Sequence, residues 1–391
     1  MIQTSHKIHF ADSRELGFIA SGSVGLIVTS PPYPMIEMWD DCFKAQSKDI
    51  RTAIDDCDGR TAFTLMHKEL DKVWSHVYRV LIDGGIASIN IGDATRTLGK
   101  TFRLYSNHSR ILSYCFELGF DILPVILWKK TTNAPNKFMG SGMLPPGAYV
   151  TLEHEYILIL RKGDKRSFSS NEEKLNRQES AFFWEERNIW FSDVWDLKGT
   201  KQNLNHKEVR NRSAAFPFEL AYRLINMFST RHDTVLDPFL GTGTTIHAAI
   251  ASERNSIGIE IDNNFQSYLA EATPKVLATL NEYISDRFQR HITFIEEYSR
   301  KKGQPKHVNS YYGFPVVTSQ EVKLRLRYVD KVEKIIGETP EYRISYAEGP
   351  VVGKPDFTGL DKLPASNKQL RLALYRRSHS NRTRIPSSFF S

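Results

Sequence analysis

An α/β fold built around a mostly parallel sheet is what this sequence predicts. The first 290 residues or so alternate short, β-branched apolar runs with amphipathic stretches, which is typical of strands joined by helices. A length of 391 residues fits one large domain or two modest ones. A hydrophobic content of 40% with 25% charged residues argues against wholesale disorder.

Seven apolar runs have the length and composition of strands, and three longer stretches are amphipathic. Helices are expected at Leu65–Leu81, at Pro217–Phe228 and from Phe265 onward, where the preceding Asp-Asn-Asn supplies a start signal. The apolar residues of Pro217–Phe228 fall on one helix face. The expected strands are Lys7–Ala11, Val24–Thr29, Ile86–Ile91, Ile122–Trp128, Tyr156–Leu160, Thr234–Asp237 and Ser256–Ile261.

Two regions break the alternation. Arg161–Arg187 is charged and polar, and we expect it to be an insertion between elements of the sheet. After Ser285 the chain becomes basic and tyrosine-rich, with Gly and Pro punctuation, which predicts a C-terminal extension over residues 286–391 that follows a domain over residues 1–285. Residues 366–391 carry six Lys and Arg and no acid, so they account for six of the seven net positive charges. Such a tail suits a polyanion such as nucleic acid, and a merely solvated tail has the same composition.

Other broad classes are disfavoured by the sequence. Its apolar runs are too short to span a membrane, and its first ten residues lack the apolar core of a signal peptide, so we expect a cytoplasmic protein. The three cysteines, Cys42, Cys57 and Cys115, are too few and scattered for a disulfide framework or a zinc cluster, and no metal site is expected.

A Ser-Pro-Pro-Tyr segment, Ser30 to Tyr33, directly follows the strand expected at Val24–Thr29. Each proline fixes its own φ and has no N–H to donate, so the carbonyls of Ser30 and Pro31 are held as hydrogen-bond acceptors. They lie at the carboxyl end of a strand, where open α/β sheets bind ligands, and Tyr33 adds an aromatic face. A proline-terminated edge strand is the simpler alternative.

A glycine-rich unit follows some two hundred residues later. The strand expected at Thr234–Asp237 runs into Pro-Phe-Leu-Gly-Thr-Gly-Thr, a helix follows, and the next strand reaches Glu260. Gly241 and Gly243 allow close backbone approach, and the free N–H groups of the helix can bind an anion. Glu260 stands where an acidic side chain receives ribose hydroxyls, whereas the missing third glycine argues against a dinucleotide.

In this order the two motifs resemble those of the β-class of S-adenosylmethionine-dependent DNA amino-methyltransferases, found in restriction-modification systems. The resemblance covers roughly residues 6–270. It implies a doubly wound, mostly parallel seven-stranded sheet of the Rossmann-like methyltransferase fold, circularly permuted, with S-adenosylmethionine as cofactor and double-stranded DNA as substrate. Further matching segments are Phe10–Ser13, Gly84–Asp93, Leu127–Lys130, Glu155–Leu158, Trp195–Asp196 and Ala215–Pro217.

The resemblance also assigns roles to residues. Ser30 Oγ and the Pro31 carbonyl would accept the hydrogens of the target amino group, Pro32 belongs to the same rigid turn, and the flipped base would stack on Tyr33. Catalysis would be chiefly alignment. Asp93 is either a pocket residue or part of a turn at the end of a strand. The expected cofactor-binding residues are Asp12, Phe216, Pro217, Asp237, Pro238, Phe239, Gly241, Gly243, Thr244 and Glu260, the last of them on the ribose.

Serine at the first motif position resembles the cytosine-N4 enzymes, whereas adenine-N6 enzymes usually carry Asp or Asn there. We therefore expect methylation of cytosine N4, with adenine N6 as the alternative. Covalent C5 chemistry is disfavoured because no cysteine follows a proline. A non-catalytic DNA-binding subunit and an RNA- or protein-directed enzyme are further alternatives. The intact motifs argue against the first, and the motif order argues against the second.

DNA recognition is expected in two places. In the β-class the recognition region usually follows the strand that corresponds to Tyr156–Leu160, which here points to residues 161–212. A cognate restriction endonuclease that acts on the same site is an expected partner. The extension would add Tyr311, Tyr312, Lys323, Arg325 and Arg327, unless it is a structural cap; the candidates in the insertion are Arg161, Lys162, Lys165, Arg166, Arg177, Trp184, Arg187, Trp190, Lys198, Lys201, His206, Lys207, Arg210 and Arg212.

Overall fold

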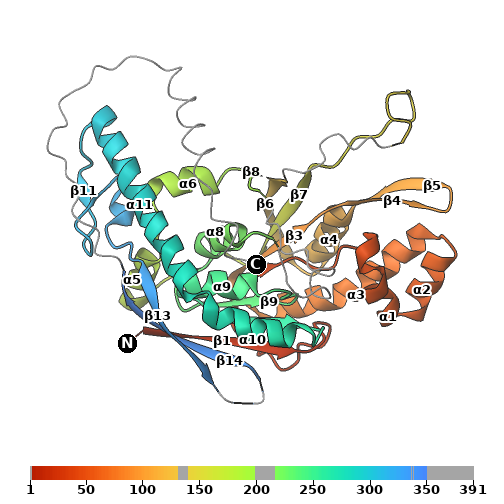
Figure 1. The fold of residues 1–391 in the computed structure, drawn as a ribbon, viewed down its shortest axis with the longest axis horizontal. Helices are drawn as coiled ribbons and strands as arrows, with labels where there is room; N and C mark the ends of the chain where they lie inside the picture. The colour runs from red at the N-terminus through yellow and green to blue at the C-terminus, as the bar shows by residue number, and fades with distance from the viewer. Residues whose placement is uncertain (1, 131–139, 199–215, 336, 338, 350–391) are drawn as a thin grey trace.

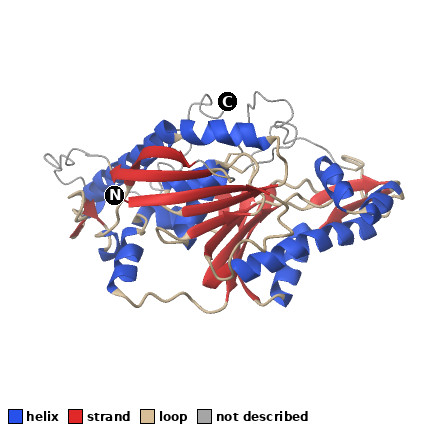
Figure 2. Ribbon diagram, turned by 90° about the horizontal axis from the view of Figure 1, so that it is seen from below, coloured by secondary structure: helices blue, strands red, loops and turns tan. Residues whose placement is uncertain are grey.

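A single large sheet runs through the molecule and carries helices on both faces (Figures 1 and 2). This computed structural model describes residues 2–130, 140–198, 216–335, 337 and 339–349. Within these ranges no helix is both long and apolar enough to cross a membrane.

Ten strands form the sheet, in the order β13-β14-β1-β10-β9-β2-β3-β7-β6-β8. The five strands from β1 to β3 in this order run parallel, and β7 is antiparallel to both of its neighbours. Strands far apart in the chain are neighbours in the sheet, as the permuted order requires. Their bounds are β1 Ile2–Phe10, β2 Val24–Thr29, β3 Leu81–Ile91, β6 Phe120–Lys129, β7 His154–Lys162, β8 Val194–Asp196, β9 Thr234–Asp237, β10 Asn255–Glu260, β13 Arg327–Ile335 and β14 Glu341–Glu348.

All seven expected strands are present, but the expected number of seven is too small. β8 was missed because it has only three residues and pairs at the outer edge, beside β6. β13 and β14 were missed because they lie in the extension, which pairs antiparallel with β1 and so continues the same sheet. The hairpin thereby covers an edge of β1 that would otherwise expose unpaired backbone groups.

Each face of the sheet packs against its own set of helices. In β2, Leu26 and Val28 pack with α8, α9 and α11, whereas Ile27 points to the other face and packs with α2, α3 and α4. This alternation follows from the two-residue repeat of a strand. The helices are α1 Asp40–Gln46, α2 Lys48–Asp55, α3 Gly59–Val80, α4 Asn107–Glu117, α5 Asn171–Glu179, α6 Trp184–Trp190, α8 Phe218–Phe228, α9 Thr244–Ala251, α10 Phe265–Lys275 and α11 Leu277–Lys302; a small hairpin, β4 Ala94–Leu98 with β5 Thr101–Tyr105, leaves the end of β3.

The insertion and the extension pack together. We call residues 171–190, 284–302 and 307–329 the peripheral unit. Its apolar centre joins Phe183 of the insertion to Phe288 of α11 and Phe314 of the extension. The domain boundary expected at residue 285 falls inside α11, which is continuous through that point and packs on the sheet with its first half. A change in composition therefore does not mark a change of domain here.

Candidate active site

The two sequence motifs meet at one edge of the sheet. β2 leads into the Ser-Pro-Pro-Tyr turn and β9 leads into the glycine loop, and these two strands are parallel neighbours. Ser30 follows Thr29, which pairs with Ile89 of β3, while Asp237 pairs with Gly258 of β10. Because the carboxyl ends of parallel strands lie at the same edge, the Ser-Pro-Pro-Tyr turn and the expected cofactor loop are side by side.

Asp237 joins the two motifs directly. Its Oδ1 accepts a hydrogen bond of 2.6 Å from Thr29 Oγ1, and its Oδ2 accepts one of 2.6 Å from Thr245 Oγ1. Oδ1 also accepts from the backbone N–H of Phe239 at 3.0 Å. Burial raises the pKa of this carboxyl to about 6, although the three hydrogen bonds oppose the shift. Asp237 therefore binds β2 to the glycine loop and has both oxygens in use.

The glycine loop is held by Glu260. Its Oε2 accepts from the N–H of Gly241 at 2.8 Å, and its Oε1 accepts from the N–H of Asp262 at 2.9 Å. Burial raises the pKa of Glu260, in opposition to these two backbone hydrogen bonds. Gly241 and Gly243 have φ values of +53° and +84°, in the left-handed region that favours glycine.

The donor set of this loop fits an adenosine-containing cofactor. A carboxylate offers about four lone-pair positions, and the two backbone contacts leave capacity on Glu260 for two ribose hydroxyls. A Cβ atom built at Gly241 would meet no described atom within 4 Å, so the loop faces open space. By contrast, a Cβ at Gly243 would come within 2.8 Å of Leu269, which explains glycine at that buried position.

The other expected cofactor residues lie just after β1, just before α8, and in the loop or at its helix. Asp12 follows the end of β1 and forms an ion pair of 2.6 Å with Arg14. Partial burial opposes ionisation of Asp12, but the hydrogen bonds and charge of Arg14 outweigh it and lower the pKa. The hydroxyl of Ser13 donates to the carbonyl of Pro238, which ties the end of β1 to the loop. Of the rest, Phe216 and Pro217 are buried before α8, Phe239 lies edge-on to Trp74, and Thr244 is the first residue of α9.

The Ser-Pro-Pro-Tyr turn forms a polar network that the sequence analysis did not include. Tyr33 Oη lies 3.1 Å from Ser30 Oγ and donates to Glu155 Oε2 at 2.9 Å. Asn90 Nδ2 donates to Tyr33 Oη at 2.8 Å and to the same carboxylate oxygen at 2.7 Å, while Lys130 binds the other oxygen. Glu155 and Lys130 stood within segments that matched the family, but only the pairing of β7 with β3 and with β6 brings them to the turn.

Another residue that the sequence analysis did not single out contacts the segment that follows the turn. Asn107, at the start of α4 and fully buried, donates its amide hydrogens to the carbonyls of Pro34 at 3.1 Å and Gly92 at 2.9 Å. Its own Oδ1 contacts His67 at 3.0 Å. Asn107 thus fastens the residue after the turn to the end of β3. Asp93, for which a pocket role and a strand-end turn were both open, has its Oδ2 2.8 Å from His108 Nδ1.

Several residues expected to read DNA contact other groups of the protein, whereas Lys165, Arg177, Arg187 and Lys198 of the insertion are exposed. In the insertion, Arg166 pairs with Asp233 at 2.6 Å and Trp190 is buried. In the extension, Arg327 is 4% exposed and pairs with Glu253 at 2.6 Å. The remaining extension residues contact neighbours within the protein: Tyr311 binds Glu179, Tyr312 binds the Leu326 carbonyl, Lys323 lies over the Tyr311 ring, and Arg325 pairs with Glu179 and Glu348. Lys201, His206, Lys207, Arg210 and Arg212 lie outside the described residues.

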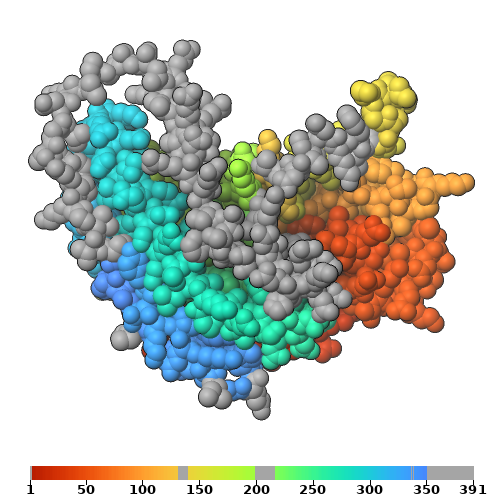
Figure 3. Space-filling view, in the orientation of Figure 1, coloured from red at the N-terminus to blue at the C-terminus, as the bar shows by residue number. Residues whose placement is uncertain are grey.

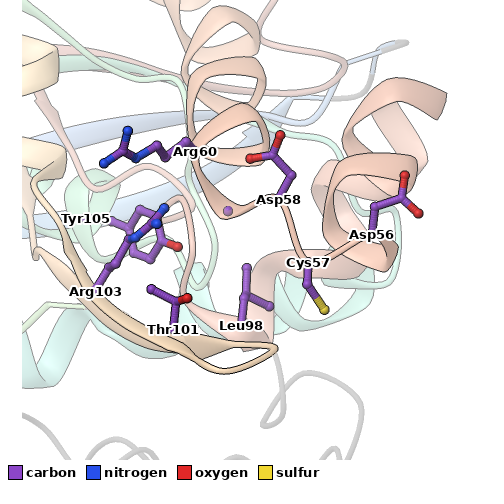
Figure 4. A pocket seen from close by; sticks show the side chains of 9 residues that line it. Asp56, Cys57, Asp58, Arg60, Leu98, Thr101, Arg103 and Tyr105 are labelled. Carbon is purple, nitrogen blue, oxygen red and sulfur yellow. The ribbon is translucent and has the colours of Figure 1, made fainter.

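One cavity of about 430 Å³ lies between the α2–α3 turn and the β4–β5 hairpin, and none of its lining residues is an expected site residue (Figure 4). Asp56 and Asp58 face it from the turn, and Arg103 and Tyr105 from β5. In the described ranges no cluster of three or more His, Cys, Asp or Glu side chains could hold a metal ion.

With this geometry in place, comparison with known proteins identifies the family. A family model described as DNA methylase, of the N6 and N4 type, matches residues 24–271. The chain belongs to this DNA methylase family. The methylase is 51% identical over 349 residues to the type II methyltransferase M.MthZI of Methanothermobacter thermautotrophicus, across 89% of this chain and 96% of the relative. It is 50% identical over 281 residues to M.MjaI of Methanocaldococcus jannaschii, across 69% and 91% of the two chains.

Solved structures agree with the fold of this methylase. TTHA0409 of Thermus thermophilus, a DNA modification methylase solved with S-adenosylmethionine, is 31% identical, with a TM-score of 0.53 over 68% of this chain and 92% of its own. The PvuII cytosine-N4 methyltransferase shares the fold at 16% identity and a TM-score of 0.50, over 69% and 86%. The expected fold class, the family and the cofactor, S-adenosylmethionine, are confirmed, and DNA is the substrate.

Proposed function

We propose that this methylase transfers a methyl group to the exocyclic N4 amine of cytosine at a specific site in duplex DNA, and so protects that DNA within a restriction-modification system. The observation that carries the proposal is the Thr29–Asp237 hydrogen bond of 2.6 Å, which fixes the Ser-Pro-Pro-Tyr turn beside the glycine loop. A cofactor on the loop and a base on the turn would then face each other. A partner endonuclease is part of the same proposal.

The residues of the turn supply alignment. The lone pair of an exocyclic amine is delocalised into the ring, so the amine attacks poorly until its hydrogens are held by acceptors. Ser30 Oγ and the rigid Pro31 carbonyl serve as those acceptors, and the ring of Tyr33 receives the flipped base. Bound S-adenosylmethionine supplies an activated sulfonium methyl group. Orientation of this kind can supply roughly 7–11 kcal/mol of the barrier, and base stacking on Tyr33 roughly 1–3 kcal/mol toward flipping.

Cytosine is proposed over adenine because the first acceptor is the neutral, short side chain of Ser30 and not the Asp or Asn usual in adenine-N6 enzymes. The test incubates the purified protein with S-adenosylmethionine and unmethylated duplex DNA, followed by mass spectrometry of the nucleosides. N4-methylcytosine is the expected product. N6-methyladenine alone would reverse the choice of base, and no methylated base at all would support a non-catalytic DNA-binding role.

We place the DNA in the hollow that Figure 3 shows between the end of α11 and the loop at residues 140–150. The loop carries exposed apolar side chains, among them Met143 and Leu144. Tyr149 stacks on Phe102 of β5 with ring centroids 4.5 Å apart, which links the loop to the β4–β5 hairpin. This hairpin follows β3 at the catalytic edge, by which we mean the carboxyl ends of β2, β3 and β9 with the turn and the glycine loop.

The insertion at 161–212 and the extension at 286–391 remain proposed contributors to recognition. Removal of residues 350–391 leaves every described strand in place and tests the basic tail, whose loss should weaken binding to all DNA sequences and flatten its salt dependence.

A further inference from the structure

A chain of three oxygen atoms leads from the catalytic turn to a buried carboxylate. Ser30 Oγ lies 3.1 Å from Tyr33 Oη, and Tyr33 Oη lies 2.9 Å from Glu155 Oε2. Glu155 is 8% exposed and stands at the start of β7, on a different segment from either motif. Neither the sequence motifs nor the acceptor roles proposed above account for it.

The direction of the hydrogen bonds in this chain follows from counting protons. The Glu155 carboxylate can only accept, so the Asn90 group that faces it is the NH₂ group and the Tyr33 hydroxyl donates to it. The single proton of Tyr33 is then committed, and Tyr33 Oη can only accept from its other neighbours, Ser30 and Asn90. The single proton of Ser30 therefore points to Tyr33. Both lone pairs of Ser30 Oγ stay free.

The far end of the chain is fixed as well. Lys130 binds Glu155 Oε1, while Oε2 accepts the hydrogen bond from Tyr33. Burial, and after it the charge of Glu155, raises the pKa of the Tyr33 phenol well above its usual value, so the phenol keeps its proton. The side chain of Lys130 is 38% exposed and connects the carboxylate to the surface.

We propose that Glu155 is a positioning residue that, through Tyr33, turns Ser30 into a pure hydrogen-bond acceptor for the target amine, and that it receives the proton the amine gives up. The inference rests on the proposed function. As the nitrogen lone pair forms the N–CH₃ bond, the S–CH₃ bond breaks with its electrons left on sulfur. The nitrogen then loses one proton to Ser30 Oγ, the proton of Ser30 passes to Tyr33 Oη, and the proton of Tyr33 passes to Glu155. The base ends neutral and the carboxyl protonated.

The test is a double-mutant cycle on the full chain with Glu155→Gln, Tyr33→Phe and the combined variant, read as single-turnover methyl transfer to duplex DNA. The matched control is Tyr156→Phe. Tyr156 follows Glu155 directly, but its ring stacks on His108 and takes no part in the Ser30–Tyr33–Glu155 hydrogen bonds. Each single variant should lower the transfer rate about 10²-fold, and the KM values for DNA and S-adenosylmethionine should stay within about twofold. The combined variant should be no slower than the slower single one, and the control should match the wild type.

The outcomes separate the two proposals. A wild-type protein that transfers no methyl group contradicts the proposed function itself. An active wild type with an unaffected Glu155→Gln variant, or losses that multiply in the combined variant, overturns the role of Glu155. If Glu155→Gln does not fold, Tyr33→Phe decides alone: it keeps the aromatic ring and the Glu155 contacts with Asn90 and Lys130, so an unchanged rate overturns the inference.

Discussion

The catalytic edge and the peripheral unit both concentrate charged and aromatic residues, but they use them in opposite ways. In the peripheral unit Arg287 is 1% exposed, binds both oxygens of Glu186 at 2.6 and 2.7 Å, and also donates to Tyr222. Its charge is therefore paired with a carboxylate inside the protein. At the catalytic edge the carboxylate of Glu260 and the hydroxyl of Ser30 keep lone pairs free. The comparison teaches that Lys and Arg residues indicate nucleic-acid contact only when they are not already paired with acidic groups of the protein itself.

The largest effect is expected from breaking the pairing in the peripheral unit. Arg287→Ala leaves Glu186 charged and buried without its partner, which should lower the free energy of unfolding by about 3–5 kcal/mol. Urea denaturation of the variant measures this loss. Arg300→Ala, exposed on the same helix, is the control and should be near neutral. An Arg287→Ala protein as stable as the wild type would mean that this pair does not hold the unit together.

At the catalytic edge the expected loss is in rate and not in stability. Ser30→Ala removes one of the two proposed acceptors and should lower kcat about 10²–10³-fold, equivalent to about 2.7–4 kcal/mol of transition-state stabilisation. Thermal stability and cofactor affinity should not change. Ser23→Ala, an exposed serine just before the same strand, should leave kcat unaltered. Equal kcat values for the two variants would remove Ser30 from the mechanism.

The edge should also give a pH signature that can be assigned to one residue, Asp237. The pKa of Asp237 is raised from 3.8 to about 6, so the folded protein holds this proton over a range where the unfolded chain has released it. The group therefore lowers the free energy of unfolding as pH rises from about 4 to 6, by up to about 3 kcal/mol. Asp237→Asn keeps the shape without the charge. Wild type and variant should diverge in urea stability across this window, and parallel curves would contradict the assignment.

The smallest effect should come from a partly exposed ion pair in the extension. Arg325 binds Glu348, whose side chain is 67% exposed, and its contact with Glu179 is long, at 3.5 Å, so Arg325→Ala should cost less than about 1 kcal/mol of stability. Because Arg325 is engaged within the protein, the ratio of specific to non-specific DNA affinity, measured at fixed salt, should not change. A lower ratio would return this residue to the DNA interface.

The sequence predicts the catalytic edge far better than the peripheral unit, and the reason is local. Val24–Thr29 and Thr234–Asp237 are strands at the expected bounds because both are almost wholly buried, and an unbroken apolar run marks such a strand. Their ends carry motifs that are contiguous in sequence. Glu186 and Arg287 lie 101 residues apart, and the residues next to each do not indicate which side chain it will pair with.

The same limit applies within the site. Glu155 stands in an apolar strand, and nothing adjacent to it distinguishes a carboxylate that binds Tyr33 from one that faces solvent. Its position depends on the antiparallel pairing of β7 with β3, where Tyr156 lies opposite Ile91. A long-range register of this kind sets which side chains meet, and short-range pattern does not encode it.

Strand β1 sits between β10 and β14, so it pairs only with segments that are made about 250 and 340 residues later. When β10 leaves the ribosome, β2, β3, β7 and β6 have already been made and can pair as a partial sheet. During synthesis of this methylase, β1 therefore stays without its sheet partners until β10 and then β14 have been made.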